Sequence, residues 1–258
     1  LTEFLPVSSS GHLVLIPIVT DFPYQGRAID VAAHVGTLIA VAVYLRAEII
    51  AILRALLRLG RGDEHNARLG IMLVLATIPV IIVGYIVNYA NWHWLDMVQT
   101  LAVANLVFAA ILWGADKVPA AQHDLKQISW RHALVIGVVQ ICALVPGASR
   151  SGVTMSAARF LGFDRVTAAR FSLLLSLPTI AGAGLLKTID LVQSGDAALG
   201  SDAVVVAVLS AVLAWLAIRW MMGWLAVASF RIFVYYRLVL GGLLLLALTQ
   251  DWIAPSIT

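Results

Sequence analysis

The chain has 258 residues, of which 61% are hydrophobic and 12% are charged, and its mean hydropathy is +0.95. Soluble domains carry roughly 45–50% apolar and about 25% charged residues, so this composition excludes a soluble globular protein and indicates an integral membrane protein. The net charge of +3 does not indicate nucleic-acid binding, because the basic residues concentrate in loops on one side of the predicted spans. The single cysteine, Cys142, excludes an intramolecular disulfide and a cysteine-based metal cage.

Six apolar runs are long enough to cross a bilayer, whose hydrocarbon core of about 30 Å takes roughly 20 helical residues. Because a spanning segment must satisfy its own backbone hydrogen bonds, these runs predict helices. In chain order they cover residues 28–46, 69–88, 95–114, 167–188, 203–222 and 232–250. The sequence therefore predicts an all-α integral membrane protein, a polytopic helical bundle that forms a single transmembrane domain over residues 1–258.

Two further segments are apolar but interrupted, and we expect each to form a re-entrant helical hairpin. LTEFLPVSSSGH, residues 1–12, carries a glutamate, three serines and a histidine among apolar residues. Residues 132–146 are too short to cross and end at Pro146 and Gly147. Non-helical backbone at membrane depth is tolerated only where it is buried in protein or lines a wet cavity. The SSSGH and GASRSG segments are therefore expected to face each other across such a cavity.

The two interrupted segments predict an internal repeat. An offset of 140 residues places LPVSSSGH on VPGASRSG and residues 28–43 on 168–183, with few identities but the same order of features. Repeat 1 would cover about 1–114, with its start expected upstream of Leu1, and repeat 2 about 132–250. Corresponding spans then cross in opposite directions, so the repeats have inverted topology, which places a site near the midplane where they meet.

The basic residues also predict an orientation. If residues 46–68 are cytoplasmic, alternation places residues 114–131 on the same side, and most of the 17 basic residues then fall inside. This bias fits the positive-inside rule. Arg159, Arg219 and Arg237 are among the residues expected on the cytoplasmic side.

LVPGASRSGVT, residues 144–154, has the composition of an anion-binding loop. Its arginine, Arg150, is a functional candidate by default, because inserting a charge at membrane depth costs at least about 2.5–3.5 kcal/mol. A guanidinium can hold phosphate oxygens through two parallel hydrogen bonds, and the amides at a helix start also favour an anion. The alternative is that Arg150 pairs with Glu3 or extends to the cytoplasmic surface. The neighbours that would complete the loop are Gly147, Ser149, Ser151 and Thr154.

The first loop supplies groups that suit phosphoryl transfer. Glu3 and His12 are its ionisable side chains, and Ser8, Ser9 and Ser10 offer hydroxyls. A serine needs a base to attack phosphorus, and a carboxylate can instead hold a divalent metal. A lone histidine is more often structural, and serines in apolar helices often bond back to their own helix. Combined with an anion-binding arginine, however, the set indicates phosphoryl transfer.

Together, LTEFLPVSSSGH and LVPGASRSGVT resemble the two signature segments of the bacterial undecaprenyl-diphosphate phosphatase family, also called the bacitracin-resistance phosphatases. The resemblance covers essentially the whole chain. It implies hydrolysis of the terminal phosphate of undecaprenyl diphosphate, which returns the monophosphate lipid carrier to peptidoglycan synthesis and confers bacitracin resistance. It also implies a multi-pass inner-membrane homodimer whose site opens toward the periplasm, and a divalent cation, Mg²⁺ or Ca²⁺, as cofactor.

Roles follow as hypotheses from the chemistry and the resemblance. Ser9 attacks the distal phosphorus, His12 and Glu3 handle the proton and the metal, and Arg150 holds the diphosphate; direct attack by water is the alternative. Family members carry an acidic or amide residue four positions before Glu3, which here would precede Leu1. They often have Thr where this chain has Ser10 and Ala148. The remaining predicted substrate-binding residues are Ser8, Ser10, Gly147, Ser149, Ser151 and Thr154.

Two other classes of membrane protein share some of these features. A transporter or lipid flippase would share the inverted repeats and the anion-binding arginine, but it needs no nucleophile or base, and the two activities can coexist. Type 2 phosphatidic acid phosphatases also use an SGH segment. This chain has no Arg-Pro dipeptide, and Ser156 and Phe160 stand where that superfamily places its histidine and aspartate. The second class is therefore excluded.

Overall fold

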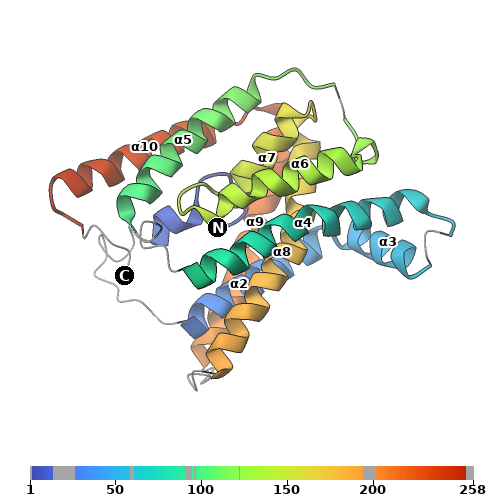
Figure 1. Ribbon diagram of the computed structural model, residues 1–258, viewed down its shortest axis with the longest axis horizontal. Coiled ribbons are helices and arrows are strands. Elements are labelled where there is room, and N and C mark those ends of the chain that lie inside the picture. The colour runs from blue at the N-terminus through green and yellow to red at the C-terminus, as the bar shows by residue number, and fades with distance from the viewer. Residues whose placement is uncertain are drawn as a thin grey trace.

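The computed structural model describes residues 2–13, 27–58, 61–90, 95, 97–121, 123–193 and 201–253. The regular elements in this part of the chain are helices (Figure 1), so the predicted all-α class is confirmed. In chain order they are α2 (Arg27–Tyr44), α3 (Arg46–Leu57), α4 (Glu64–Ala90), α5 (Val98–Asp116), the 3₁₀ turn η2 (Leu125–Gln127), α6 (Trp130–Gln140), the 3₁₀ turn η3 (Ile141–Leu144), α7 (Arg150–Phe160), α8 (Arg165–Gln193), α9 (Ser201–Val227) and α10 (Arg231–Thr249).

Five helices are long and apolar enough to cross a membrane: α4, α5, α8, α9 and α10. Each coincides with one of the predicted apolar runs. The sixth run differs, because α2 ends at Tyr44 and the chain bends by 83° into α3. No proline or glycine causes this bend. The apolar run stops at Leu45, and the charged residues Arg46 and Glu48 follow it into an amphipathic helix that packs on α4.

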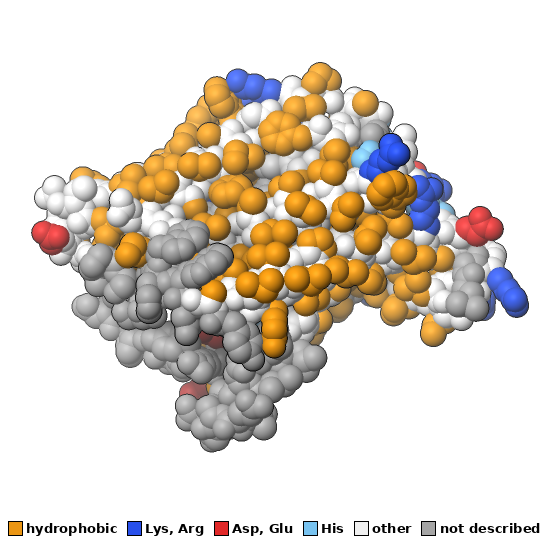
Figure 2. All heavy atoms as spheres, in the orientation of Figure 1, with side chains coloured by type: hydrophobic (Ala, Val, Ile, Leu, Met, Phe, Trp, Pro, Cys, Tyr) orange, Lys and Arg blue, Asp and Glu red, His pale blue; other side chains and the backbone are white. Residues whose placement is uncertain are grey.

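The surface is that of a protein surrounded by lipid. Hydrophobic side chains cover much of the face shown in Figure 2, while Lys and Arg gather toward its right and upper edges. On α9, Val204, Val208 and Val212 are each more than half exposed although the helix is apolar along its length. A helix that is hydrophobic all round belongs in a protein core or in a membrane. The polytopic membrane class is therefore confirmed.

The spanning helices pack in pairs. α5 lies beside α10, and α4 lies beside α6 (Figure 1). α2 crosses α9 so closely that a Cβ on Gly36 would lie 2.2 Å from the carbonyl oxygen of Ala207. Small residues permit such close backbone approaches between membrane helices. The short helix α7 packs against α5, α6 and α8, inside the bundle rather than at its lipid face.

Several features support the predicted two-repeat organisation. α4 and α9 both have 27 residues, and α5 and α10 both have 19, in the order that repeats over 1–114 and 132–250 require. The packing of α2 on α9 has a counterpart in the packing of α8 on α4. The inverted direction of the two halves stays a prediction.

The segment predicted to be re-entrant folds as two short helices. α6 and α7 each have 11 residues, about half of what a crossing requires. Ser129 begins α6, where its Oγ accepts the His132 N–H at 3.3 Å, and Ser149 begins α7, where its Oγ accepts the Gly152 N–H at 3.3 Å. In the first half, residues 2–13 contain the equivalent turn at Ser8 and the first helical residues after it, 9–13.

Candidate active site

The two loops that the sequence predicts to face each other are in direct contact. Arg150 donates from Nη2 to Glu3 Oε1 at 3.2 Å, with both side chains largely shielded from solvent. The Ser151 hydroxyl donates to the carbonyl oxygen of Leu5 at 2.9 Å. The Gly147 N–H donates to Ser10 Oγ at 3.1 Å. The structure thus brings residues from opposite halves of the chain into one polar cluster, here called the two-loop site.

The loops share an unusual backbone conformation. Ser8 has a φ of 69° and Ser149 a φ of 67°, and in each loop a helix begins at the next residue. A positive φ costs a non-glycine residue on the order of 1–3 kcal/mol and is found mainly at functional sites. Their spacing is 141 residues, one more than the offset that the residue order suggests. The hydroxyls repeat at this spacing too, with Oγ to Oγ distances of 3.0 Å for Ser8–Ser10 and 3.2 Å for Ser149–Ser151.

Gly147 cannot be replaced without moving the backbone. Its φ is 92°, and a Cβ there would lie 2.1 Å from the carbonyl oxygen of Leu101 on α5. Its N–H is held by Ser10, and its carbonyl oxygen accepts a hydrogen bond from Arg237 Nη2 at 2.8 Å. The predicted role of Gly147 therefore depends on its backbone, which fixes the approach to α7.

Arg237, which the charge bias counts among the residues on the cytoplasmic side, lies inside the bundle. Its side chain is fully buried on α10, where Nε donates to Asn105 Oδ1 at 2.9 Å and Nη2 donates to the carbonyls of Gly147 and Ala148. Asn105 Nδ2 in turn donates to the carbonyl of Arg237 at 2.9 Å. Backbone carbonyls and an amide replace water around Nε and Nη2, while Nη1 is buried without a hydrogen-bond partner among the described residues. The sequence signal was an arginine and an asparagine within apolar runs.

Arg159 was also expected on the cytoplasmic side and is also buried. Its guanidinium donates to the carbonyls of Phe163, Asp116 and Val118, at the end of α7 and after α5. Arg219, in contrast, is exposed on α9. Counting positive charges thus did not separate surface arginines from those that hold helix ends together.

Ser9 is paired with the carboxylate of the first loop. Its hydroxyl donates to Glu3 Oε2 at 3.1 Å. His12 has other partners: Nδ1 lies 2.8 Å from the Ser8 carbonyl, and Nε2 lies 2.5 Å from the Tyr236 hydroxyl. Because a carbonyl only accepts, Nδ1 carries a proton in this arrangement. Of the two candidate bases, Glu3 is therefore the one in contact with Ser9, and Tyr236 contacts His12 although the sequence did not predict it.

The predicted catalytic and substrate-binding residues that carry a hydroxyl or a guanidinium fall into two groups. Ser9, Ser10, Ser149 and Arg150 keep partial exposure. Ser8, Ser151 and Thr154 are almost completely buried. The Thr154 hydroxyl lies within hydrogen-bond distance of the Arg150 and Ser151 carbonyls and of Ser172 Oγ, at 2.7 Å from the latter. The buried hydroxyls hold the loops in place, while the partly exposed side chains are available to a ligand.

The expected metal site at Glu3 is incomplete. Both carboxylate oxygens already accept hydrogen bonds, from Arg150 and Ser9. Within the described ranges, no group of three or more His, Cys, Asp and Glu side chains is arranged to hold a metal ion. Magnesium prefers octahedral oxygen coordination, and a single carboxylate beside a guanidinium does not provide it. The described residues therefore offer a divalent cation at most the Glu3 carboxylate, and further ligands would be needed.

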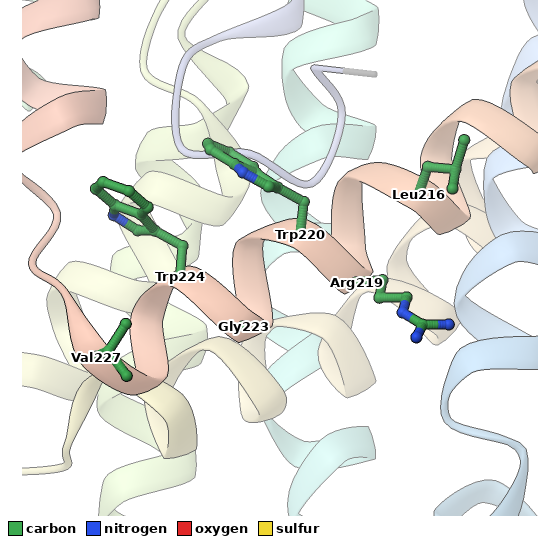
Figure 3. A pocket seen from close by; sticks show the side chains of 6 residues that line it. All are labelled: Leu216, Arg219, Trp220, Gly223, Trp224 and Val227. Atoms are coloured by element: carbon green, nitrogen blue, oxygen red, sulfur yellow. The ribbon is translucent and has the colours of Figure 1, made fainter.

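A shallow hollow of about 540 Å³ lies elsewhere on the surface, along one face of α9. Figure 3 shows Trp220 and Trp224 projecting to the same side of this helix, with Arg219 pointing away from them. The hollow contains none of the predicted site residues. Its lining is Leu216, Arg219, Trp220, Gly223, Trp224 and Val227.

Related sequences identify the family of this chain. The sequence model for the family described as bacitracin resistance protein BacA matches residues 1–243. An undecaprenyl-diphosphatase of Chromohalobacter salexigens is 41% identical over 256 residues, which cover 98% of this chain and 95% of that protein. The undecaprenyl-diphosphatase of Teredinibacter turnerae is 44% identical over 249 residues, covering 96% and 94%, and that of Roseobacter denitrificans is 42% identical over 250 residues, covering 95% and 93%. The chain therefore belongs to the BacA family.

Proposed function

We propose that the protein is a membrane phosphatase that hydrolyses undecaprenyl diphosphate to undecaprenyl phosphate and inorganic phosphate. One observation carries the proposal: Arg150, Glu3 and Ser9 form a continuous chain of hydrogen bonds across the two loops. An anion-binding guanidinium, a base and a nucleophile therefore lie together. The names of the relatives support the choice of substrate.

Arg150 would bind the diphosphate. Its planar guanidinium has five N–H donors, and one of them is used by Glu3, so others can donate to phosphate oxygens in a bidentate geometry. The N-terminus of α7 adds backbone amides that favour an anion. Arg237, buried behind the Gly147 and Ala148 carbonyls, fixes the loop that presents these groups.

Ser9 would act as the nucleophile, with Glu3 as its base. Ser9 Oγ forms a bond to the distal phosphorus while the bond from that phosphorus to the bridging oxygen breaks, and the Ser9 proton passes to Glu3 Oε2. Undecaprenyl phosphate leaves, and water then hydrolyses the phosphoserine to release inorganic phosphate. His12 lies between the Ser8 carbonyl and Tyr236, close to the same loop. Direct attack by a water molecule is the alternative mechanism.

The setting suits a lipid substrate. A polyprenyl tail partitions into the hydrocarbon, so an enzyme that acts on its diphosphate must present polar groups at membrane depth, as the two buried loops do. The finer parts of the proposal are recycling of the carrier lipid for peptidoglycan synthesis and resistance to bacitracin. They include a location in the bacterial inner membrane, with the site open toward the periplasm, and a possible homodimer.

A divalent cation, Mg²⁺ or Ca²⁺, is also proposed as a cofactor, arriving with the substrate. Magnesium is often held by one or two carboxylates together with substrate phosphate oxygens. Such an ion would neutralise charge on the diphosphate. Its remaining ligands would have to come from the substrate or from parts of the protein outside the described residues.

The test is release of inorganic phosphate from undecaprenyl diphosphate by the purified protein in detergent, where no compartment exists for transport. We expect turnover by the wild type, a loss of at least about 100-fold in Arg150→Ala, and near wild-type activity in Arg219→Ala, which removes an exposed arginine outside the site. Chelator is added in a parallel series to test the cation. Phosphate release that is absent from the folded wild type, or equal in Arg150→Ala, would overturn the proposal.

A further inference from the structure

Helix α3 has two faces with different surroundings. On one face, Ile52 and Leu56 pack against Gly70 of α4. A Cβ added to Gly70 would lie 2.8 Å from a side-chain carbon of each. On the other face, Ile50 is 44% exposed, Leu53 53% and Leu57 84%. At about 100° per residue these three side chains fall within about 60° of one another around the helix. They form an outward-facing apolar stripe, here called the α3 stripe.

Arginines border the stripe. Arg54 and Arg58 are exposed and lie within about 100° of Leu57 around the helix. The acidic residue of α3, Glu48, pairs with Arg170 of α8 at 3.6 Å. Over the described ranges, the ion pairs found involve neither Arg54 nor Arg58. The outer face of α3 therefore combines exposed apolar surface with uncompensated positive charge.

The direction of α3 places this face at a membrane surface. α3 turns by 83° from α2, so if α2 runs along the membrane normal, α3 runs nearly in the membrane plane. A helix with an apolar face bordered by arginines lies in the interface, with its apolar side chains among the acyl chains and its cations at the phosphates. The packing of Ile52 and Leu56 on α4 holds α3 at this level.

We propose that α3 is an interfacial helix that binds the anionic headgroups of phospholipids in the leaflet where α2 ends. The α3 stripe enters the acyl region, and Arg54 and Arg58 contact the phosphates. Charge complementarity selects this occupant: a second copy of the chain docked through the same face by a two-fold axis would bring like charges together. The proposal is independent of the phosphatase activity.

The test uses a fluorescent label on the stripe. In a Cys142→Ala background, Leu57→Cys carries the environment-sensitive dye NBD, and the full-length protein is placed in nanodiscs of phosphatidylglycerol and phosphatidylcholine in equal parts. Brominated acyl chains are carried by one lipid or by the other. We expect quenching at residue 57 but little at a label on Arg61→Cys in the following loop, and stronger quenching by brominated phosphatidylglycerol, with a preference of about fivefold per arginine.

Matched variants separate a specific contact from general attraction. Arg54→Gln with Arg58→Gln should bring the quenching ratio of the two lipids close to one, whereas Arg54→Lys with Arg58→Lys should preserve the preference. Arg61→Gln with Arg68→Gln removes the same charge from nearby exposed positions and should leave the ratio unchanged. The proposal fails if the label is unquenched by both lipids, if the wild-type ratio is one, or if Leu57→Cys copies cross-link with each other.

Discussion

The two loops of the active site share one backbone plan and carry different chemistry. Each has a proline two or three residues before a serine with positive φ, a helix that starts directly after that serine, and a pair of serine hydroxyls two residues apart. At the first helical position, however, the first loop has Ser9 and the second has Arg150. One loop therefore carries the proposed nucleophile at the position where the other carries the proposed anion-binding cation.

The loops are also supported differently. Arg237 of α10 donates a hydrogen bond to the backbone of the second loop, and Asn105 of α5 bonds to Arg237 in turn. The helices α5 and α10 pack side by side. The first loop is held mainly by the second loop and by Tyr236. This difference indicates that the second loop is the fixed platform on which the first is assembled. It also predicts that changes in the first loop alter the chemical step, while changes behind the second loop alter both loops together.

The largest effect is expected for Ser9→Ala. If Ser9 is the nucleophile, its removal should lower phosphate release by at least about 10⁴-fold, since losing a covalent nucleophile removes the first step of the mechanism. Ser8→Ala is the control, because the buried Ser8 hydroxyl bonds to Ser10 within the loop. Mass spectrometry of acid-quenched wild-type enzyme should detect phosphate on Ser9. Intact turnover in Ser9→Ala would mean that water attacks directly.

Arg150→Lys should produce the next largest loss, about 100- to 1,000-fold in kcat. Lysine keeps the charge but cannot make the two parallel hydrogen bonds that a guanidinium makes to phosphate. Arg231→Lys, an exposed position at the start of α10, serves as the control. Turnover close to wild type in Arg150→Lys, measured as kcat and KM for undecaprenyl diphosphate, would reduce Arg150 to a charge partner of Glu3.

Much of the bundle was accessible from the sequence because lipid imposes simple rules. Apolar runs of about 20 residues predicted α4, α5, α8, α9 and α10, and the polar residues within apolar surroundings predicted that the two loops meet. The bend after α2 was missed, since neither proline nor glycine marks it. The bend depends on the direction that the chain takes after the apolar run ends, and composition does not determine that direction.

The parts of the site that the sequence did not predict depend on contacts between residues far apart in the chain. Tyr236 meets His12 across 224 positions, and no local pattern distinguishes it from an interfacial tyrosine. Arg237 was counted with the surface arginines, because a charge count does not tell whether backbone carbonyls or water surround a guanidinium. The pairing of Ser9 with Glu3 rather than with His12 likewise follows from three-dimensional geometry.

Asn105→Ala should affect both loops at once, with a smaller effect. The substitution leaves Nε of the buried Arg237 without its closest partner, at an expected stability cost of about 1–3 kcal/mol. We expect kcat/KM to fall about tenfold and the unfolding temperature to drop. Ser176→Ala is matched, because it removes a buried hydroxyl that bonds within α8. It should lower stability without changing kcat/KM. Equal kcat/KM values in Asn105→Ala and Ser176→Ala would contradict the idea that the second loop supports the first.

The smallest effect is expected for Ser10→Ala. Ser10 accepts the Gly147 N–H, so its loss removes one contact between the loops and is expected to cost about 1 kcal/mol, a few-fold in kcat/KM. Ser151→Ala breaks the contact with the Leu5 carbonyl in a more deeply buried place and should cost somewhat more. The double variant should lose less than the sum if both contacts hold the same interface. If Ser10→Ala lost as much activity as Ser9→Ala, Ser10 and not Ser9 would be the better candidate for the nucleophile.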